Sequence, residues 1–274
     1  MSYFVYMLIS QHNNKFYSYV GYTNDLKKRL VDHNNSKGAK YTKGRIWNII
    51  YKKKYLSKSK AMKEEYFLKK NTKLRSNIKK KYLIKNNLVH KTAVINWKKV
   101  KIGKNNVFGP YVVIGNHPQW PKKKSNGYIY IGNNNFFNEY CNVHLPTNLT
   151  KKTIIGNHNY FMNSTTIDHD CLIENNITLS SNVILGGNIH IMNNANIGIK
   201  SIIHQNQIIG SYSMIGMGSI ITKKIHIEPG YIYYGKPVKK IKKNLIGLKK
   251  NKISNFMLLK EKKRFIKLLK IKKK

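Results

Sequence analysis

The chain has 274 residues, with 52 lysines and arginines against 10 aspartates and glutamates and a formal net charge of +42. A hydrophobic content of 41% and an aromatic content of 11% exclude a disordered basic tail and allow a substantial core. No apolar run approaches the roughly 18 residues that a membrane span needs, and the first residues lack the cationic start of a secretory signal. Cys141 and Cys171 are too far apart for a CxxC metal site. We therefore expect a cytoplasmic protein with no membrane span.

The positive charge is concentrated in the two ends of the chain. Residues 1–87 carry 22 lysines and arginines against 4 acidic residues, and residues 239–274 carry 16 against 1. Such a density attracts phosphate groups, most simply those of nucleic acid or nucleotides. Lys, Asn, Ile and Tyr are all abundant together, which codon bias in an AT-rich genome would also produce, so both explanations of the charge stay open.

Residues 1–85 have no long-period repeat and predict a small α/β domain. Residues 3–9 and 16–22 are rich in strand-forming side chains and are joined by a short polar turn, as in a β-hairpin. Asn24 is expected to cap a helix whose Leu26 and Leu30 face inward. Residues 47–56 predict a third strand, and a second helix is expected to start at Ser57 or Ser59.

From Ile131 onward a large apolar residue recurs at every sixth position. A period of six is neither helical nor that of a simple strand, and it indicates a triangular solenoid in which one side chain from each flat side fills the core. An earlier series (Ile102, Phe108, Ile114) has a different phase, so residues 116–127 are predicted to be a loop between coils. We predict a left-handed parallel β-helix over residues 86–230. Its core positions are Ile131, Phe137, Val143, Leu149, Ile155, Phe161, Ile167, Ile173, Leu179, Leu185, Ile191, Ile197, Ile203, Ile209, Ile215, Ile221 and Ile227.

Two further features concern the turns and the end of this solenoid. Glycine often follows a core position, and we expect it where the backbone must turn tightly; the examples are Gly132, Gly156, Gly186, Gly198, Gly210 and Gly216. After Pro237 apolar residues alternate with lysines in a helical pattern, so residues 231–274 are predicted to form a basic C-terminal helical region. This region would either cap the solenoid or bind an acidic partner.

The first domain resembles the small single-domain members of the GIY-YIG nuclease family over nearly all of residues 2–82. The residues 4–6 (FVY) stand where GIY belongs, with Phe4 in place of its glycine, and residues 19–21 (YVG) stand for YIG. The stretch TNDLKKRLVDHNNSKGAKYTKGR and the helix AMKEEYFLKK follow. The resemblance implies phosphodiester cleavage and DNA as a partner for residues 1–85.

The same resemblance implies a role for each polar residue of the motif. Glu65 would hold Mg²⁺ (or Mn²⁺), and Arg29 would clamp the scissile phosphate. Tyr6 and Tyr19 would position or deprotonate the attacking water, with His33 assisting proton transfer. Glu64, beside Glu65, is assigned to solvent.

The second domain resembles the UDP-N-acetylglucosamine O-acyltransferases that begin lipid A synthesis, over about residues 88–252. The resemblance rests on residues 152–222, on VHLPTNL at 143–149 and on GLKK at 247–250. It implies transfer of a 3-hydroxyacyl group from acyl carrier protein to the 3-hydroxyl of UDP-N-acetylglucosamine. No cofactor is implied, and the family works as a homotrimer with active sites between subunits.

The acyltransferase resemblance also assigns catalytic residues. His169, within Asp168-His169-Asp170, would be the general base, with Asp170 orienting its imidazole. The backbone N–H of Gly187 would stabilise the thioester oxyanion. The substrate-binding positions are His204, Gln205, Asn188, Met217 and Lys250. Met217 would close the far end of the acyl groove, and Lys250 would bind the diphosphate.

The sequence departs from the acyltransferase pattern in several places. Thr166 and Asn188 replace family histidines, and Asn251 replaces an arginine. Three hypotheses therefore stay open. The chain is an acyltransferase fused to a GIY-YIG module, or a metal-dependent endonuclease or nucleic-acid-binding protein whose β-helix is only a trimerisation scaffold. Alternatively, it is a fusion of neighbouring genes in which one half is decaying.

Overall fold

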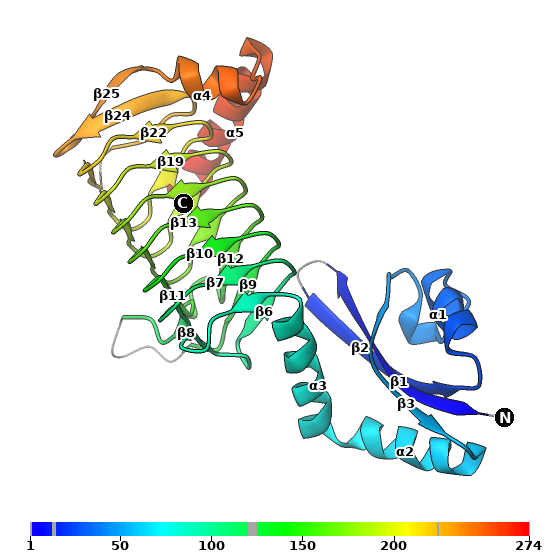
Figure 1. The fold of residues 1–274 in the computed structure, drawn as a ribbon. Coiled ribbons are helices and arrows are strands. Elements are labelled where there is room, and N and C mark those ends of the chain that lie inside the picture. The colour runs from blue at the N-terminus through cyan, green and yellow to red at the C-terminus, as the bar shows by residue number, and fades with distance from the viewer. Residues whose placement is uncertain (1, 13–14, 120–124, 224, 274) are drawn as a thin grey trace. The chain divides into compact units, whose positions relative to one another are not determined.

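The computed structural model describes residues 2–12, 15–119, 125–223 and 225–273, and the chain divides into two compact units, Met1–Asn86 and Asn87–Lys274 (Figure 1). The first unit contains a three-stranded antiparallel sheet of order β2-β1-β3. Its elements are β1 (Tyr3–His12), β2 (Lys15–Thr23), α1 (Leu26–Asn34), η1 (Lys40–Thr42), β3 (Asn48–Tyr55), α2 (Lys58–Lys70) and α3 (Thr72–Lys85). The predicted small α/β domain is confirmed.

Both faces of the central strand β1 are buried because its side chains alternate between two helical layers. Val5 and Met7 pack with Ala61 and Leu68 of α2. On the other face, Tyr6 and Leu8 pack with Trp47 and, at the edge, with the leucines of α1. The cap of α1 is Asp25, whose carboxylate accepts a hydrogen bond from Lys28 N at 2.9 Å, so the expectation of Asn24 was wrong. Ser57 caps α2, as one of the two sequence alternatives predicted.

The second unit is a left-handed parallel β-helix with strands in three sheets. The nine-stranded sheet has the order β25-β24-β22-β19-β16-β13-β10-β7-β4, the seven-stranded sheet β23-β20-β17-β14-β11-β8-β5, and the six-stranded sheet β21-β18-β15-β12-β9-β6. The strands up to β14 are β4 (Leu88–Val89), β5 (Val94–Ile95), β6 (Val100–Ile102), β7 (Val107–Phe108), β8 (Val113–Asn116), β9 (Tyr128–Ile131), β10 (Phe136–Phe137), β11 (Asn142–His144), β12 (Lys152–Ile155), β13 (Tyr160–Phe161) and β14 (Thr166–Ile167).

The later coils follow the same path. They consist of β15 (Leu172–Ile173), β16 (Thr178–Leu179), β17 (Ile184–Leu185), β18 (His190–Ile191), β19 (Asn196–Ile197), β20 (Ile202–Ile203), β21 (Ile208–Ile209), β22 (Met214–Ile215) and β23 (Ile220–Ile221). The unit ends with β24 (Tyr231–Gly235), β25 (Val238–Lys243), α4 (Leu245–Lys250) and α5 (Asn255–Lys273), which Figure 1 shows at one end of the solenoid and along its side.

The hexad positions fill the solenoid core, with one exception. Sixteen of the seventeen hexad positions are buried in one hydrophobic cluster; they are the members of the series from Ile131 to Val143 and from Ile155 to Ile227. Leu149 is 71% exposed and lies between β11 and β12. Between the core residues Val143 and Ile155 the chain has six extra residues, which form a loop outside the core. Because six is the length of one repeat, the apolar pattern keeps its phase across the loop. The prediction for Leu149 was therefore wrong.

The glycines that follow core residues do not form the turns. Gly132 and Gly156 have no positive φ, and a Cβ at either would lie 2.5 Å from a carbonyl oxygen of the next coil. Close stacking of coils therefore requires these glycines. At regular corners in the described part of the solenoid, the left-handed residue comes three positions after a core residue, as at Asn134 (φ 56°), Asp170 (φ 61°) and Asn188 (φ 57°). Asn and Asp are the non-glycine residues that adopt this conformation most readily.

A buried ladder of asparagines connects successive coils. The Oδ1 atom of Asn135 accepts a hydrogen bond from Asn159 N at 3.0 Å, and the Oδ1 of Asn159 accepts one from Ile177 N at 2.8 Å. The amide Nδ2 of Asn159 donates to Glu174 O at 2.9 Å. These side chains supply partners for backbone groups that would otherwise be buried without one.

The segment after residue 230 differs from the predicted helical region. Tyr231–Gly235 and Val238–Lys243 form an antiparallel hairpin that extends the nine-stranded sheet, and helix begins only at Leu245. Helix α5 then packs on the six-stranded sheet, where Phe265 contacts Met192 and Ile208. The lysines of Val238–Lys243 lie on an exposed edge strand, where charged side chains are common. The helical prediction was therefore wrong for residues 231–243 and is confirmed for Leu245–Lys250 and Asn255–Lys273.

We predict that Asn159→Ala lowers the melting temperature and the urea midpoint of the protein. The change leaves the N–H of Ile177 and the carbonyl of Glu174 without partners, at a cost of about 1–3 kcal/mol for each buried group. Asn196→Ala, at an exposed strand position of the same solenoid, is the matched control and should shift neither value. Equal effects of the two substitutions would contradict this role of the ladder.

Candidate active sites

The first candidate site lies where β1, β2 and α1 of the first unit meet. The rings of Tyr6, Tyr19 and His33 form a cluster, with centroids 5.0 Å apart for Tyr19 and His33 and 6.4 Å apart for the two tyrosines. Arg29 Nε donates a hydrogen bond to Tyr6 Oη at 3.4 Å. Four of the five residues predicted for this site are thus in direct contact.

Hydrogen bonding determines the tautomer of His33. The hydroxyl of Thr42 donates to Ala39 O at 2.7 Å, so its oxygen must accept from His33 Nδ1 at 2.8 Å. His33 Nε2 is then an acceptor, and the Tyr6 hydroxyl donates its proton to it at 2.9 Å. The phenol proton of Tyr6 is therefore directed at a neutral imidazole whose position Thr42 fixes.

The electrostatics of this cluster depend on burial. Burial raises the pKa of Tyr6 to about 12, while the hydrogen bond from Arg29 opposes that shift. Burial, together with the nearby Arg29 charge, lowers the pKa of His33 below its ordinary value of 6.5. At neutral pH the pair is thus a neutral phenol and a neutral imidazole, with the Arg29 cation beside them.

Two glycines leave room for these rings. A Cβ at Gly21 would lie 2.6 Å from Tyr6 Oη, and a Cβ at Gly38 would lie 2.4 Å from His33 Nδ1. The glycine of the YVG segment is therefore needed because the Tyr6 hydroxyl lies against its Cα. Sequence reasoning did not single out Gly38 or Thr42. Thr42 accepts the hydrogen bond of His33 Nδ1, and Gly38 packs against the His33 ring.

Glu65 of α2 is not in direct contact with the cluster in the interactions that the structure gives, although its charge adds a small contribution to the raised pKa of Tyr6. Its side chain is 16% exposed, and its Oε1 lies 2.7 Å from Lys69 Nζ. Within the described ranges no group of three His, Cys, Asp or Glu residues converges on one point. A lone carboxylate still fits Mg²⁺, which keeps several waters and commonly uses one or two carboxylates plus substrate phosphate oxygens. Glu64 is half-buried rather than in free solvent. Burial of Tyr55 is the largest cause that raises the pKa of this tyrosine, and the charge of Glu64 is the next.

The second candidate site is a corner of the solenoid, between the seven-stranded and six-stranded sheets. Residues 168–170, 186–188 and 204–206 follow β14, β17 and β20 and lie one above another, which we call the stacked corner. Asn188 N donates to His169 O at 2.8 Å, and Asn206 N donates to Gly187 O at 2.9 Å. The stacking brings together His169, Asp170, Gly187, Asn188, His204 and Gln205, all of which the sequence singled out.

Asp170 is fixed by an inserted loop that sequence reasoning did not connect with it. The hydroxyl of Thr147 donates to Asp170 Oδ2 at 2.6 Å, and the hydroxyl of Thr150 donates to Oδ1. His169 Nδ1 lies 2.8 Å from the same Oδ2. Burial would raise the pKa of Asp170, but the hydrogen bonds from His169 and the two threonines outweigh it and hold that pKa well below its ordinary value.

The imidazole of His169 lies over the Cα of Gly187. A Cβ at that glycine would come 2.2 Å from His169 Cε1. The side chain of His169 is 12% exposed, so the ring is held between Asp170 and the next coil while retaining access to solvent. Only glycine at position 187 permits this arrangement.

Asp168 and His144 belong to the same corner, although the sequence analysis gave neither a role. Asp168 Oδ2 lies 4.0 Å from His169 Nε2, and Asp168 Oδ1 lies 3.5 Å from His144 Nδ1. His144 is buried, and its pKa is lowered by burial. In the sequence His144 belongs to the VHLPTNL segment. The fold places it beside Asp168 because β11 pairs with β14.

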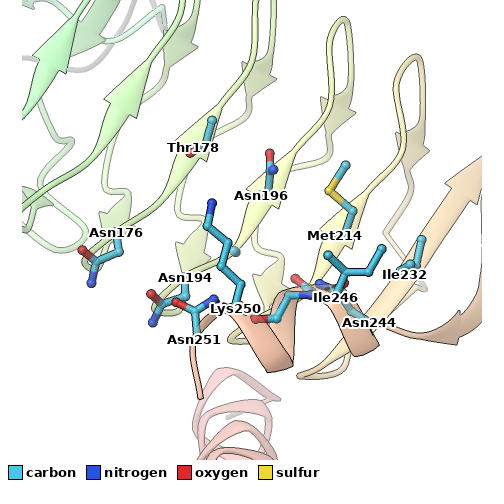
Figure 2. Close-up of a pocket in the computed structure, with 13 residues that line it drawn as sticks. Asn176, Thr178, Asn194, Asn196, Met214, Ile232, Asn244, Ile246, Lys250 and Asn251 are labelled. Carbon is cyan, nitrogen blue, oxygen red and sulfur yellow. Dashed lines mark hydrogen bonds between the residues drawn. The ribbon is translucent and has the colours of Figure 1, made fainter. Parts of the chain in front are cut away.

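Lys250 and Met217 lie elsewhere on the solenoid. Figure 2 shows Lys250 extending from α4 over the strands that carry Thr178 and Asn196, in a pocket of about 710 Å³. This pocket lies on the nine-stranded sheet, which is opposite the stacked corner in a three-sided solenoid. Met217 follows β22 at the corner between the nine-stranded and seven-stranded sheets and is 67% exposed. One chain therefore does not bring Lys250 or Met217 to His169.

The first unit matches a known protein family. Residues 2–82 match the GIY-YIG catalytic domain family. A UPF0213 protein of Bacillus pumilus is 43% identical over 70 residues, which cover 22% of this chain and 71% of that protein. The chain belongs to the GIY-YIG family. It is also 54% identical over 52 residues to a UPF0213 protein of Oceanobacillus iheyensis, covering 19% of this chain but only 60% of that protein's length.

The second unit of this GIY-YIG protein is similar to a different group. LpxA of Bacteroides fragilis, a UDP-N-acetylglucosamine acyltransferase, has 31% sequence identity and a TM-score of 0.60, covering 65% of this chain and 69% of that one. The predicted fusion of a GIY-YIG domain with a hexapeptide β-helix of the LpxA type is confirmed. Among the residues that the structure describes, no helix has the length and apolar character to span a bilayer.

We predict that Gly187→Ala displaces the His169 imidazole while the solenoid stays folded. The added methyl group would overlap the ring, because its carbon would lie 2.2 Å from His169 Cε1. The measurements are the imidazole proton resonances of His169 and the melting temperature. Gly109→Ala, where the nearest atom would be 3.1 Å away, is the control. Unchanged His169 resonances in Gly187→Ala would contradict this packing.

Proposed function

We propose that the second unit transfers a 3-hydroxyacyl group from acyl carrier protein to the 3-hydroxyl of UDP-N-acetylglucosamine, the first step of lipid A synthesis. The observation that carries the proposal is the His169–Asp170 pair, whose imidazole packs on Gly187 of the next coil, with His204 and Gln205 on the coil after that. A sugar hydroxyl needs a general base at neutral pH, and no cofactor is required.

Each residue of the stacked corner has a part in the proposed reaction. His169 takes the proton of the acceptor hydroxyl, and Asp170 stabilises the resulting imidazolium because its carboxylate stays ionised and hydrogen-bonded. The backbone N–H of Gly187 stabilises the oxyanion of the thioester carbon. The carbon–sulfur bond then breaks, and the His169 imidazolium gives its proton to the departing thiolate of acyl carrier protein. His204, Gln205 and Asn188 line the path of the sugar nucleotide, and Lys250 binds its diphosphate.

The positions of Lys250 and Met217 support a homotrimer. They lie away from the stacked corner of their own chain. One substrate could therefore contact His169 of one subunit together with Lys250 or Met217 only if a neighbouring subunit supplies the latter. Side chains on the outer faces fit such packing, since Ile184 and Ile202 of the seven-stranded sheet are 46% and 44% exposed. Burying them against another copy would remove apolar surface from water.

A metal-dependent endonuclease is the second proposed function, with DNA bound by residues 1–85. The hydrogen-bonded series Arg29–Tyr6–His33 favours it, because a water proton could pass to Tyr6 as His33 accepts the phenol proton. Arg29 is placed to bind the scissile phosphate. Glu65 would hold Mg²⁺ or Mn²⁺, which supplies charge stabilisation on the phosphate when bound. If only this activity is present, the β-helix serves as a trimerisation scaffold.

The first proposal predicts that His169→Ala lowers kcat/KM for acyl transfer by about 10²–10⁴-fold, the usual contribution of a general base. The oligomeric state, measured by light scattering, should not change. His158→Ala, at an exposed left-handed corner of the same solenoid, should retain wild-type activity. Undiminished transfer by His169→Ala would refute the assignment of the base.

The second proposal predicts that DNA cleavage needs a divalent cation and is lost in Glu65→Gln and Arg29→Ala. Because burial and Arg29 lower the pKa of His33, the neutral acceptor form persists below pH 6.5. The acid limb of the pH–rate profile should therefore lie below that value and disappear from the profile of His33→Ala. Cleavage that proceeds with chelator, or in Glu65→Gln, would be incompatible with this site.

Met217 corresponds to the residue that closes the acyl groove in the resembled family, and its side chain predicts a preference for shorter hydroxyacyl donors. Each methylene of the acyl chain that is buried in the groove contributes about 0.8 kcal/mol to binding. A methylene forced against the Met217 side chain instead costs about 1–3 kcal/mol. Met217→Gly should extend the preferred chain by several carbons. Competition among acyl-carrier thioesters of increasing length measures the preference, and an identical length profile in the variant would exclude this role.

A further inference from the structure

The carboxylate of Asp168 lies at the stacked corner between two imidazoles. Its Oδ2 is 4.0 Å from His169 Nε2, and its Oδ1 is 3.5 Å from His144 Nδ1. Asp170 binds the other ring nitrogen of His169, Nδ1, at 2.8 Å. The two acidic residues therefore flank the proposed base from opposite sides. Of these two carboxylates, that of Asp170 lies within hydrogen-bond distance of the ring and that of Asp168 does not.

The orientation of Asp168 is set by its first oxygen. His169 N donates to Oδ1 at 2.8 Å, and the buried His144 ring packs on the same side. No hydrogen-bond partner of His144 Nδ1 occurs within the described part of the chain. This arrangement turns Oδ2 toward His169 Nε2, the nitrogen from which the proposed reaction would proceed.

The separation between Oδ2 and Nε2 suits a ligand rather than a direct contact. A distance of 4.0 Å is too long for a hydrogen bond, for which heavy atoms lie about 2.7–3.2 Å apart. The side chains of Asp168 and His169 are 21% and 12% exposed, so both can be reached. Two donor groups on adjacent atoms of one ligand could contact the pair, one on each acceptor.

An ionised carboxylate only accepts hydrogen bonds, so its ligand must donate. A sugar has this chemistry: the carbons on either side of the acceptor hydroxyl carry a hydroxyl and an acetamido N–H. We propose that Asp168 is a specificity-determining residue, which binds the donor group next to the hydroxyl that His169 deprotonates. The inference rests on the proposed acyl transfer and adds the residue that recognises the acceptor's neighbouring group.

The test compares Asp168→Ala with wild type on three acceptors: UDP-N-acetylglucosamine, its 4-deoxy analogue and UDP-2-deoxyglucose. In wild type, one analogue should lose about 10- to 100-fold in kcat/KM, since a charged hydrogen bond contributes about 1.5–3 kcal/mol. In Asp168→Ala that loss should shrink to within about 2-fold, because the partner is gone. The affected analogue identifies the donor position.

Two further variants separate recognition from other roles. Asp168→Asn keeps an acceptor oxygen, so it should retain part of the discrimination while removing the charge beside His169. Glu139→Ala, an exposed acid at another corner, should behave as wild type on all three acceptors. Melting temperatures establish that each variant is folded.

The outcomes distinguish this inference from the proposed function. If wild type transfers no acyl group to UDP-N-acetylglucosamine, the proposed function itself fails. If wild type is active but Asp168→Ala keeps the full discrimination between acceptors, Asp168 does not read the neighbouring group. A variant that only shifts the pH–rate profile, with acceptor ratios unchanged, would show that Asp168 acts through His169 and would also overturn the proposal.

Discussion

The parallel pairing of each strand with the strand one full coil away is the constraint on which the second unit depends. Pairs such as His190 and Ile208, or Thr166 and Ile184, are hydrogen-bonded neighbours. The pairing forces every residue to lie above its counterpart in the previous coil. Residues 168–170, 186–188 and 204–206 are consequently brought together at one corner, where distant parts of the chain form one candidate site.

The same stacking accommodates an insertion at a corner, between β11 and β12, and the proposed acyl-transfer site uses it. The loop that contains Leu149 leaves the core without disturbing the pairing of β12 with β9 and β15. Because it is free of the stack, Thr147 and Thr150 can turn toward Asp170 and keep that carboxylate ionised. Without their donors, burial would act in the opposite direction and favour the neutral acid.

In the first unit the decisive constraint is the alternation of side chains along β1. Met7 enters the core beneath α2, while Tyr6, one residue earlier, lies against α1 and contacts His33 and Arg29. A register shift of one residue would exchange these environments. Burial raises the pKa of Tyr6 further above neutrality, to about 12, and the protonated hydroxyl donates its hydrogen bond to the imidazole of His33.

The sequence by itself determined the two fold types, because a period of six and the residues of the GIY-YIG motif are each local patterns. It also singled out His169, Asp170, Gly187 and the residues around Tyr6 as candidates from motif spacing, and the structure brings the members of each set into contact. It failed where a local pattern has two structural solutions: Leu149 keeps the phase of the repeat outside the core, and the lysine-rich stretch after Pro237 suits an edge strand as well as a helix. Only the tertiary structure placed Thr147, Thr150 and His144 near His169, turned Asp168 Oδ2 toward the ring, and placed Lys250 and Met217 away from it. Those relations depend on which coils stack and which face each strand presents, and no spacing within a single segment records them.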